Sequence, residues 1–176
     1  MFVKRNGDGA NVKGVTVEFR VNYDKKIQIE SGFTIQKSLY ENPVSYSDEL
    51  GSKRSFLRTP NNYGYATIDY TPSDKFRLST NLVHTGTMDL VHMGGAPEQQ
   101  NDEYKTSDVF NAIGVKATYV QKMKKVAVSL EYSLGVKNLT NDYQSDFDSG
   151  KERDSNYIYG PSVPRTFYVG FVMKSL

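Results

Sequence analysis

Val126-Ala127-Val128-Ser129-Leu130-Glu131-Tyr132-Ser133-Leu134-Gly135-Val136 alternates without interruption between large apolar residues and small or polar residues. Every even position is apolar, whereas the odd positions hold Ala, Ser, Glu, Ser and Gly. Because successive side chains of a β-strand point to opposite faces, the stretch predicts a strand with one wholly apolar face. It is longer than the usual strand of about 5 to 6 residues, and it reaches the roughly 9 to 11 residues that a tilted strand needs to cross a bilayer.

The same alternation recurs along the rest of the chain. Further segments with apolar residues on one parity and polar residues on the other are 15–23, 27–39, 65–70, 76–82, 112–119 and 166–176. On the polar parity, Glu18 and Glu30 form a pair of carboxylates across the first hairpin, and we expect them to meet Arg20 or other basic groups. The pattern predicts an all-β, antiparallel up-and-down meander of about seven long strands.

The segments between the predicted strands differ in length in a regular way. Short turns near 24–26, 71–74 and 121–125 alternate with long polar segments at 41–63, 87–109 and 138–165. Outer-membrane barrels combine short turns on one side with long loops on the other, so we expect a partial transmembrane β-barrel. About seven strands leave two edges that hydrocarbon cannot satisfy. We therefore expect the remaining strands to come from a longer chain, or from an oligomer that shares one barrel.

Composition excludes several classes of protein. The mean hydropathy is −0.57 and no apolar run approaches the roughly 20 residues of a spanning helix, which excludes helical spans but not a barrel with alternating faces. The chain has no Cys, and its net charge of +2 is spread without a basic patch for nucleic acid. The start, 1–9, does not resemble an export signal, so we expect an N-terminal portion to be missing from this sequence.

Three stretches resemble the C-terminal part of the β-barrel of TonB-dependent outer-membrane receptors. In Leu134-Gly135-Val136-Lys137-Asn138-Leu139-Thr140-Asn141-Asp142-Tyr143, a strand that ends in Gly-Val-Lys-Asn-Leu is followed by Asn and Tyr. Residues 157–161 and 164–171 are similar to the last loop and closing strand of the family, and residues 82–88 resemble a strand-to-loop passage of siderophore and cobalamin receptors.

The resemblance implies a location, a function and a set of partners. Residues 1–176 would form the C-terminal segment of the receptor barrel in the cell outer membrane, with the plug and the earlier strands absent. The function implied is active uptake of a scarce ligand such as an iron siderophore, haem or cobalamin. The partners implied are outer-membrane lipid, the remainder of the receptor, TonB-ExbB-ExbD acting through the missing plug, and a surface lipoprotein over the loops.

Candidate ligand-binding residues lie in the long polar segments or, for His84, where a predicted strand passes into one. His84, Met88, His92 and Met93 could contact a metal chelate at the mouth of a barrel, although scattered loop residues are the favoured interpretation. In the last segment, the candidates are Tyr143, Arg153, Tyr157 and Tyr159. A tyrosine offers contact area to a ligand at low entropic cost, but an aromatic girdle at the membrane interface or loop packing explains the tyrosines equally well.

Alternating carboxylates in the last long segment suggest a weak calcium site. Asp146, Asp148 and Asp154 surround Gly150, and oxygen ligands of this kind bind Ca²⁺. A solvated acidic loop is the alternative. We expect no other cofactor.

No catalytic motif is present, so we do not expect an enzyme. Two alternatives to a receptor segment remain open. One is a soluble β-sandwich or lipocalin-like binding module, in which the apolar faces would enclose a core. The other is a truncated receptor fragment without independent function.

Overall fold

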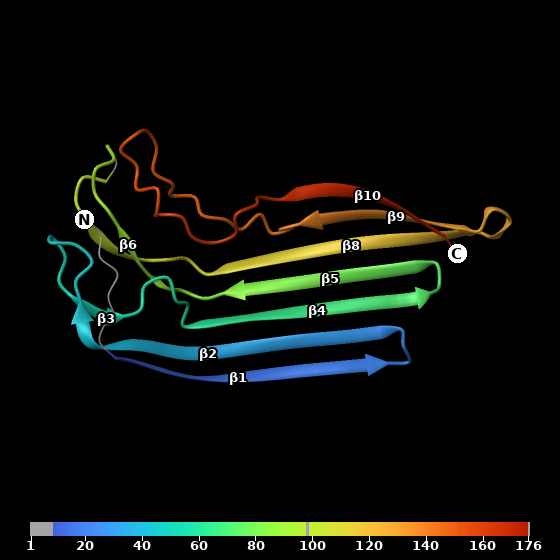
Figure 1. The fold of residues 1–176 in the computed structure, drawn as a ribbon, viewed down its shortest axis with the longest axis horizontal. Coiled ribbons are helices and arrows are strands. Elements are labelled where there is room, and N and C mark those ends of the chain that lie inside the picture. Colours follow the sequence, from blue (N-terminus) through green and yellow to red (C-terminus); the bar gives the residue numbers. More distant parts are fainter. Residues whose placement is uncertain (1–8, 98, 176) are drawn as a thin grey trace.

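A computed structural model describes residues 9–97 and 99–175 (Figure 1). The predictions about residues 1–8 and Leu176 lie outside these residues. The described chain is all-β, with long strands β1 (Ala10–Tyr23), β2 (Ile27–Val44), β4 (Asn62–Ser73), β5 (Phe76–Thr85), β8 (Phe110–Met123), β9 (Val128–Lys137) and β10 (Thr166–Ser175). They lie side by side in the order β1-β2-β4-β5-β8-β9-β10, and every neighbouring pair is antiparallel. The antiparallel up-and-down meander predicted from the periodicity is therefore confirmed.

The sheet is open over the described residues. β1 pairs only with β2, and β10 pairs only with β9, so the two outermost strands do not pair with each other. Each leaves a row of backbone N–H and C=O groups that a further strand could pair with. No helix within the described ranges is long and apolar enough to cross a membrane.

Tight turns join the strands at one end of the sheet, on the right of Figure 1. Between β1 and β2, Asp24 and Lys25 have positive φ angles of 48° and 53°, and Lys26 N donates to Tyr23 O at 3.0 Å. Two central residues with positive φ make a type I′ turn, whose twist matches that of the strands it joins. The β8–β9 connection contains a 3-10 turn, Lys124–Val126, followed by Ala127 in the left-handed region. The prediction that the strand begins at Val126 is therefore wrong by two residues.

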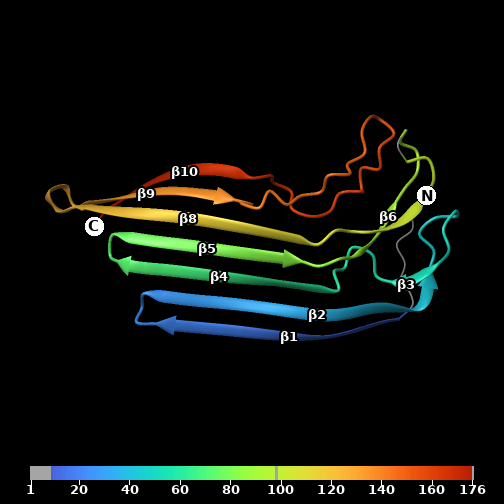
Figure 2. The same cartoon turned by 180° about the vertical axis from the view of Figure 1, so that it is seen from behind.

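The long connections gather at the opposite end, and the first two of them contain short strands (Figures 1 and 2). β3 (Lys53–Ser55) pairs with β2, and β6 (Asp89–His92) pairs with β7 (Glu103–Thr106). Three or four residues are too few to show a period of two, so the sequence does not predict these strands.

One face of the sheet, here named the apolar face, is formed by every second residue of each long strand, namely the residues on the apolar parity of that strand. Cross-strand register joins them into continuous rows, for example Val21-Ile29-Ile68-Thr80-Val115-Val136-Phe167. Among the described residues the apolar face comprises odd 15–23, odd 27–35, even 64–70, even 76–84, odd 111–123, even 128–136 and odd 167–175. None of these positions is Asp, Glu, Lys or Arg.

The opposite face, here named the polar face, carries the charged residues of the long strands, except Lys13, Lys37 and Glu41, which lie beyond the apolar face towards the long connections. Arg20 pairs with Glu30 at 2.9 Å, as expected from the sequence, and Lys174 pairs with Glu131 at 2.7 Å. Tyrosine rings also lie on this face against glycines of the neighbouring strand. A Cβ on Gly32 would meet the Tyr65 ring at 2.7 Å, so only glycine leaves room for the ring there.

The apolar face is not covered by other parts of the described chain. Val169 is 82% exposed, Phe167 72% and Val15 68%. The buried hydrophobic residues lie instead near the long connections, at Met88, Leu90, Ala96, Phe110 and Tyr157. Within residues 9–97 and 99–175, then, the apolar strand faces do not meet one another in an enclosed core.

Candidate functional site

The long connections are held together at one end of the sheet by direct contacts. Asp89 of β6 accepts a hydrogen bond from Ser55 Oγ at 2.6 Å through its carboxylate, and another from Arg58 N at 2.8 Å through its backbone oxygen. The Arg58 guanidinium donates to Ile158 O at 2.9 Å and also to Asn156 O. The first long connection is therefore bound to both the second and the third.

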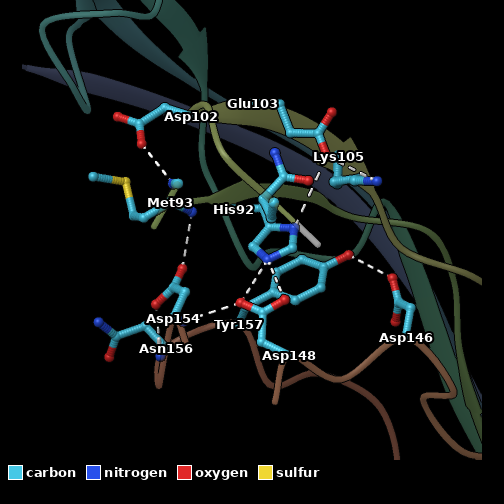
Figure 3. Close-up of polar contacts among 12 residues, drawn as sticks. His92, Met93, Asp102, Glu103, Lys105, Asp146, Asp148, Asp154, Asn156 and Tyr157 are labelled. Carbon is cyan, nitrogen blue, oxygen red and sulfur yellow. Dashed lines mark hydrogen bonds and ion pairs between the residues drawn. The ribbon is translucent and has the colours of Figure 1, made fainter. Parts of the chain in front are cut away.

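His92 is the centre of the contact between the second and third long connections (Figure 3). Its ring stacks on Tyr157, with centroids 3.6 Å apart and planes 5° from parallel. Nε2 lies 2.9 Å from both carboxylate oxygens of Asp148. Because an ionised carboxylate can only accept, Nε2 carries a proton and donates it in a hydrogen bond to Asp148. We call His92, Asp146, Asp148, Tyr157 and Tyr159 the loop junction.

The second ring nitrogen of His92 has no hydrogen-bond partner among the described atoms. Nδ1 is fully buried, and the nearest carboxylate oxygen, Glu103 Oε1, is 3.9 Å away. Glu103 is in turn paired with Lys105 at 2.8 Å. An unpaired buried polar atom costs stability, so the stacking on Tyr157 and the bond to Asp148 must outweigh that penalty.

Two tyrosine hydroxyls converge on Asp146. Tyr157 and Tyr159 each donate to its carboxylate at 2.7 Å, one to each oxygen. Burial raises the pKa of Asp146, but the two hydroxyl donors outweigh it and hold the pKa below its usual value. Burial and the bond to Asp146 raise the pKa of Tyr159 to about 12, and they raise that of Tyr157 further. Both hydroxyls therefore stay protonated and act as donors at neutral pH.

The three carboxylates suggested for calcium are each bound to protein donors. The hydrogen bond from His92 lowers the pKa of Asp148, which also accepts from Asp154 N at 3.0 Å. Asp154 accepts from Met93 N at 3.0 Å and from Asn156 N at 2.8 Å. No group of three or more His, Asp or Glu side chains in the described part of the chain is placed to hold a metal ion. The calcium site stays a prediction without support from these contacts.

Of the other ligand-binding candidates, one packs against the loop junction and the rest lie away from it. Met88 packs with Leu90 and Tyr157 in a small buried cluster, against which Tyr159 also packs. His84 instead lies in β5 on the apolar face, between Asn62 Oδ1 and Asn111 Oδ1, each 2.8 Å from a ring nitrogen. The remaining candidates, Met93, Tyr143 and Arg153, are exposed.

Several residues of this region were not predicted. Gln144 is 1% exposed; its Nε2 donates to Tyr157 O at 3.1 Å, and its Oε1 accepts from Tyr159 N at 2.9 Å. Arg58 reaches residues about a hundred positions further along the chain. A single polar residue in a long connection gives no local signal of such distant partners.

A hollow of about 620 Å³ opens on the polar face below the last long connection. Asp69, Asn81, Lys116 and Tyr168 line it from the strands, and Gly160–Val163 line it from the connection. Its volume is within the range of small-molecule sites, and its lining mixes charged, amide and aromatic groups.

The comparisons with known proteins do not identify the chain. No protein-family model matches it, and no curated protein matches it at a significant level.

Proposed function

We propose that the chain is a segment of the wall and outer loops of a TonB-dependent outer-membrane receptor, which takes up a scarce metal chelate. The observation that carries the membrane part of the proposal is the absence of any Asp, Glu, Lys or Arg from the apolar face, which runs from Val15 to Tyr23 in β1, from Ile27 to Ile35 in β2, and along the facing stretches of the other long strands. On a sheet face in contact with water, charged side chains stay hydrated, so no energetic penalty excludes them. A face against acyl chains does, since Arg or Lys at the bilayer midplane costs about 2 to 4 kcal/mol.

The extent of the uncharged face fits a bilayer. From Val15 to Tyr23 in β1, and from Ile27 to Ile35 in β2, the strands span roughly 27 Å at about 3.4 Å per residue, before allowing for tilt. Towards the tight turns, the face carries the aromatic residues Tyr23, Tyr70, Phe76, Tyr119, Tyr132 and Phe171. Outer-membrane barrels carry aromatic residues of this kind where the wall meets the lipid headgroups.

The open edges support a segment of a larger barrel rather than a complete one. β1 and β10 each present an unpaired backbone row in the described structure. Such rows are costly in hydrocarbon, so we assign further strands of the same receptor to both edges. The polar face, with its ion pairs and its hollow, would then line the interior that the plug occupies.

The transport part of the proposal rests on the resemblance of residues 134–143, 157–161 and 164–171 to the receptor family. The loop junction is compatible with it, because it fixes the long connections against each other above the polar face. Capture of a ligand outside the cell needs loops of defined shape, and rigid positioning reduces the entropy lost on binding. The chemistry proposed is binding and passage, without bond making.

Uptake measurements test the proposal directly. A strain that lacks the gene should lose energy-dependent accumulation of one radiolabelled chelate among ferric siderophores, haem and cobalamin, and the gene should restore it. A version without residues 145–158 should reach the membrane but accumulate little of that chelate. Unchanged accumulation of every chelate in the deletion strain would contradict the transport function.

A further inference from the structure

A group of cations lies just beyond the apolar face, towards the long connections. Lys13 of β1 and Lys37 of β2 are directly opposite each other, on the same parity as Val15 and Ile35, which follow them towards the tight turns. Arg54 of β3 lines the same hollow of about 390 Å³ as the two lysines. We call Lys13, Lys37 and Arg54 the basic cluster.

The basic cluster is poorly neutralised. Like charges directly opposite each other on an antiparallel pair repel. Neither lysine forms an ion pair within the described residues, and Arg54 donates through Nε to Tyr40 O at 2.9 Å. Glu41 is the carboxylate among the residues that line the hollow, so three cations face one anion. All three basic side chains are exposed, and an anion from outside could reach them.

The position of the basic cluster limits what that anion is. Below it, the apolar face runs to the tight turns without a charge in the described strands. If that face contacts acyl chains, as the proposed function requires, then the cluster is at the level of the lipid headgroups. Phosphate is the anionic group common there, and lysine and arginine both bind it through charge-assisted hydrogen bonds.

We propose that Lys13, Lys37 and Arg54 form a binding site for the phosphate group of an anionic lipid in the leaflet that surrounds the loop end of the sheet. The lipid phosphate offsets the repulsion between the two lysines, while its acyl chains lie against Val15 and Ile35 below. The inference rests on the proposed membrane orientation of the apolar face, but not on the transport of any ligand.

Binding of a phosphate lipid to the purified protein in detergent tests this site. The dissociation constant for fluorescent phosphatidic acid is measured for the unchanged protein, for Lys13→Ala/Lys37→Ala, and for the matched control Lys122→Ala/Lys151→Ala. We expect the first pair to weaken binding roughly 10- to 30-fold, from about 1 kcal/mol for each basic residue. The control pair removes the same charge elsewhere and should change binding less than about 2-fold. Equal weakening by both pairs would show a non-specific charge effect and overturn the site.

Two further arms identify the source of the phosphate and guard against misfolding. Unlabelled diacylglycerol with the same acyl chains, and inorganic phosphate, should each fail to displace the probe; displacement by inorganic phosphate at the concentrations of the lipid would overturn the lipid assignment. Lys13→Arg/Lys37→Arg keeps the charge and should bind phosphatidic acid as tightly as the unchanged protein, whereas loss of binding in this pair would overturn the role of charge.

Flotation with vesicles of phosphatidylcholine alone separates this proposal from the proposed function. The unchanged protein and Lys13→Ala/Lys37→Ala should both float, since the apolar face is intact in each. If both float but bind phosphatidic acid equally well, only the lipid site is wrong. If neither floats, the membrane orientation itself is wrong.

Discussion

Ile68→Arg should lower the free energy of unfolding in lipid vesicles by about 2 to 4 kcal/mol, the cost of a cation on the lipid side of a barrel wall near the bilayer midplane. Ile68 is in β4, in the middle of the sheet, and its row on the apolar face runs from Val21 to Phe167. Ile68 is also 44% exposed within the described chain, so the substitution fills no enclosed core and its cost comes from lipid.

The neighbouring residue provides a matched control. Thr67 lies on the polar face of the same strand and lines the hollow of about 620 Å³. Thr67→Arg should change the free energy of unfolding by less than about 1 kcal/mol, because its cation remains in water. Urea titration of both variants in vesicles makes the comparison. Similar changes in the free energy of unfolding for the two variants would contradict the assignment of the apolar face, and not the polar face, to lipid.

Tyr157→Ala should have the second large effect, confined to the long connections. Tyr157 is 2% exposed, stacks on His92 and donates to Asp146, so truncation removes packing, stacking and a hydrogen bond together. Truncation of a buried aromatic residue costs about 3 to 5 kcal/mol. Hydrogen exchange of amides in 87–106 and 144–159 should therefore accelerate by at least about 100-fold, while exchange in the long strands stays unchanged.

Two other substitutions show whether the loop junction itself is responsible. Tyr157→Phe removes only the hydroxyl and should cost about 1 kcal/mol, since Tyr159 still donates to Asp146. Tyr143→Ala alters a tyrosine that is 43% exposed in the same connection, and it should leave exchange nearly unchanged. Acceleration of the same size in Tyr143→Ala would indicate general loosening of the last connection rather than loss of the junction.

Strand positions could be predicted from the sequence because one physical pattern, alternation, is repeated over many residues. The segment from Val128 to Val136 illustrates this, since each apolar residue falls on the apolar face of β9. The start of that strand was predicted two residues early, because Val126 and Ala127 continue the alternation but belong to the turn that reverses the chain. The end of a turn depends on backbone φ angles, and a pattern of apolar and polar residues does not indicate these angles.

The loop junction could be predicted only in part. Met88, His92, Tyr157 and Tyr159 were candidates by residue type, and they do lie together. For their partners, Asp146 and Asp148, the sequence suggests a role as calcium ligands. In the structure these carboxylates accept hydrogen bonds from tyrosine and histidine instead. The sequence suggests that His84 lies where a strand passes into a loop, but β5 continues through it to Thr85. Contacts between distant connections have no periodic signature, so the sequence alone does not indicate them.

Labels on two adjacent residues test most directly whether the apolar face contacts lipid. The chain has no Cys, so Leu134→Cys and Ser133→Cys each create a single labelling site, on the apolar and polar faces of β9 respectively. In protein reconstituted in bilayers, a fluorophore at position 134 should be quenched by nitroxide-bearing lipid and resist iodide in the water, and a fluorophore at position 133 should show the reverse. Quenching by iodide at both positions, with no effect of the nitroxide lipid at 134, would contradict the account.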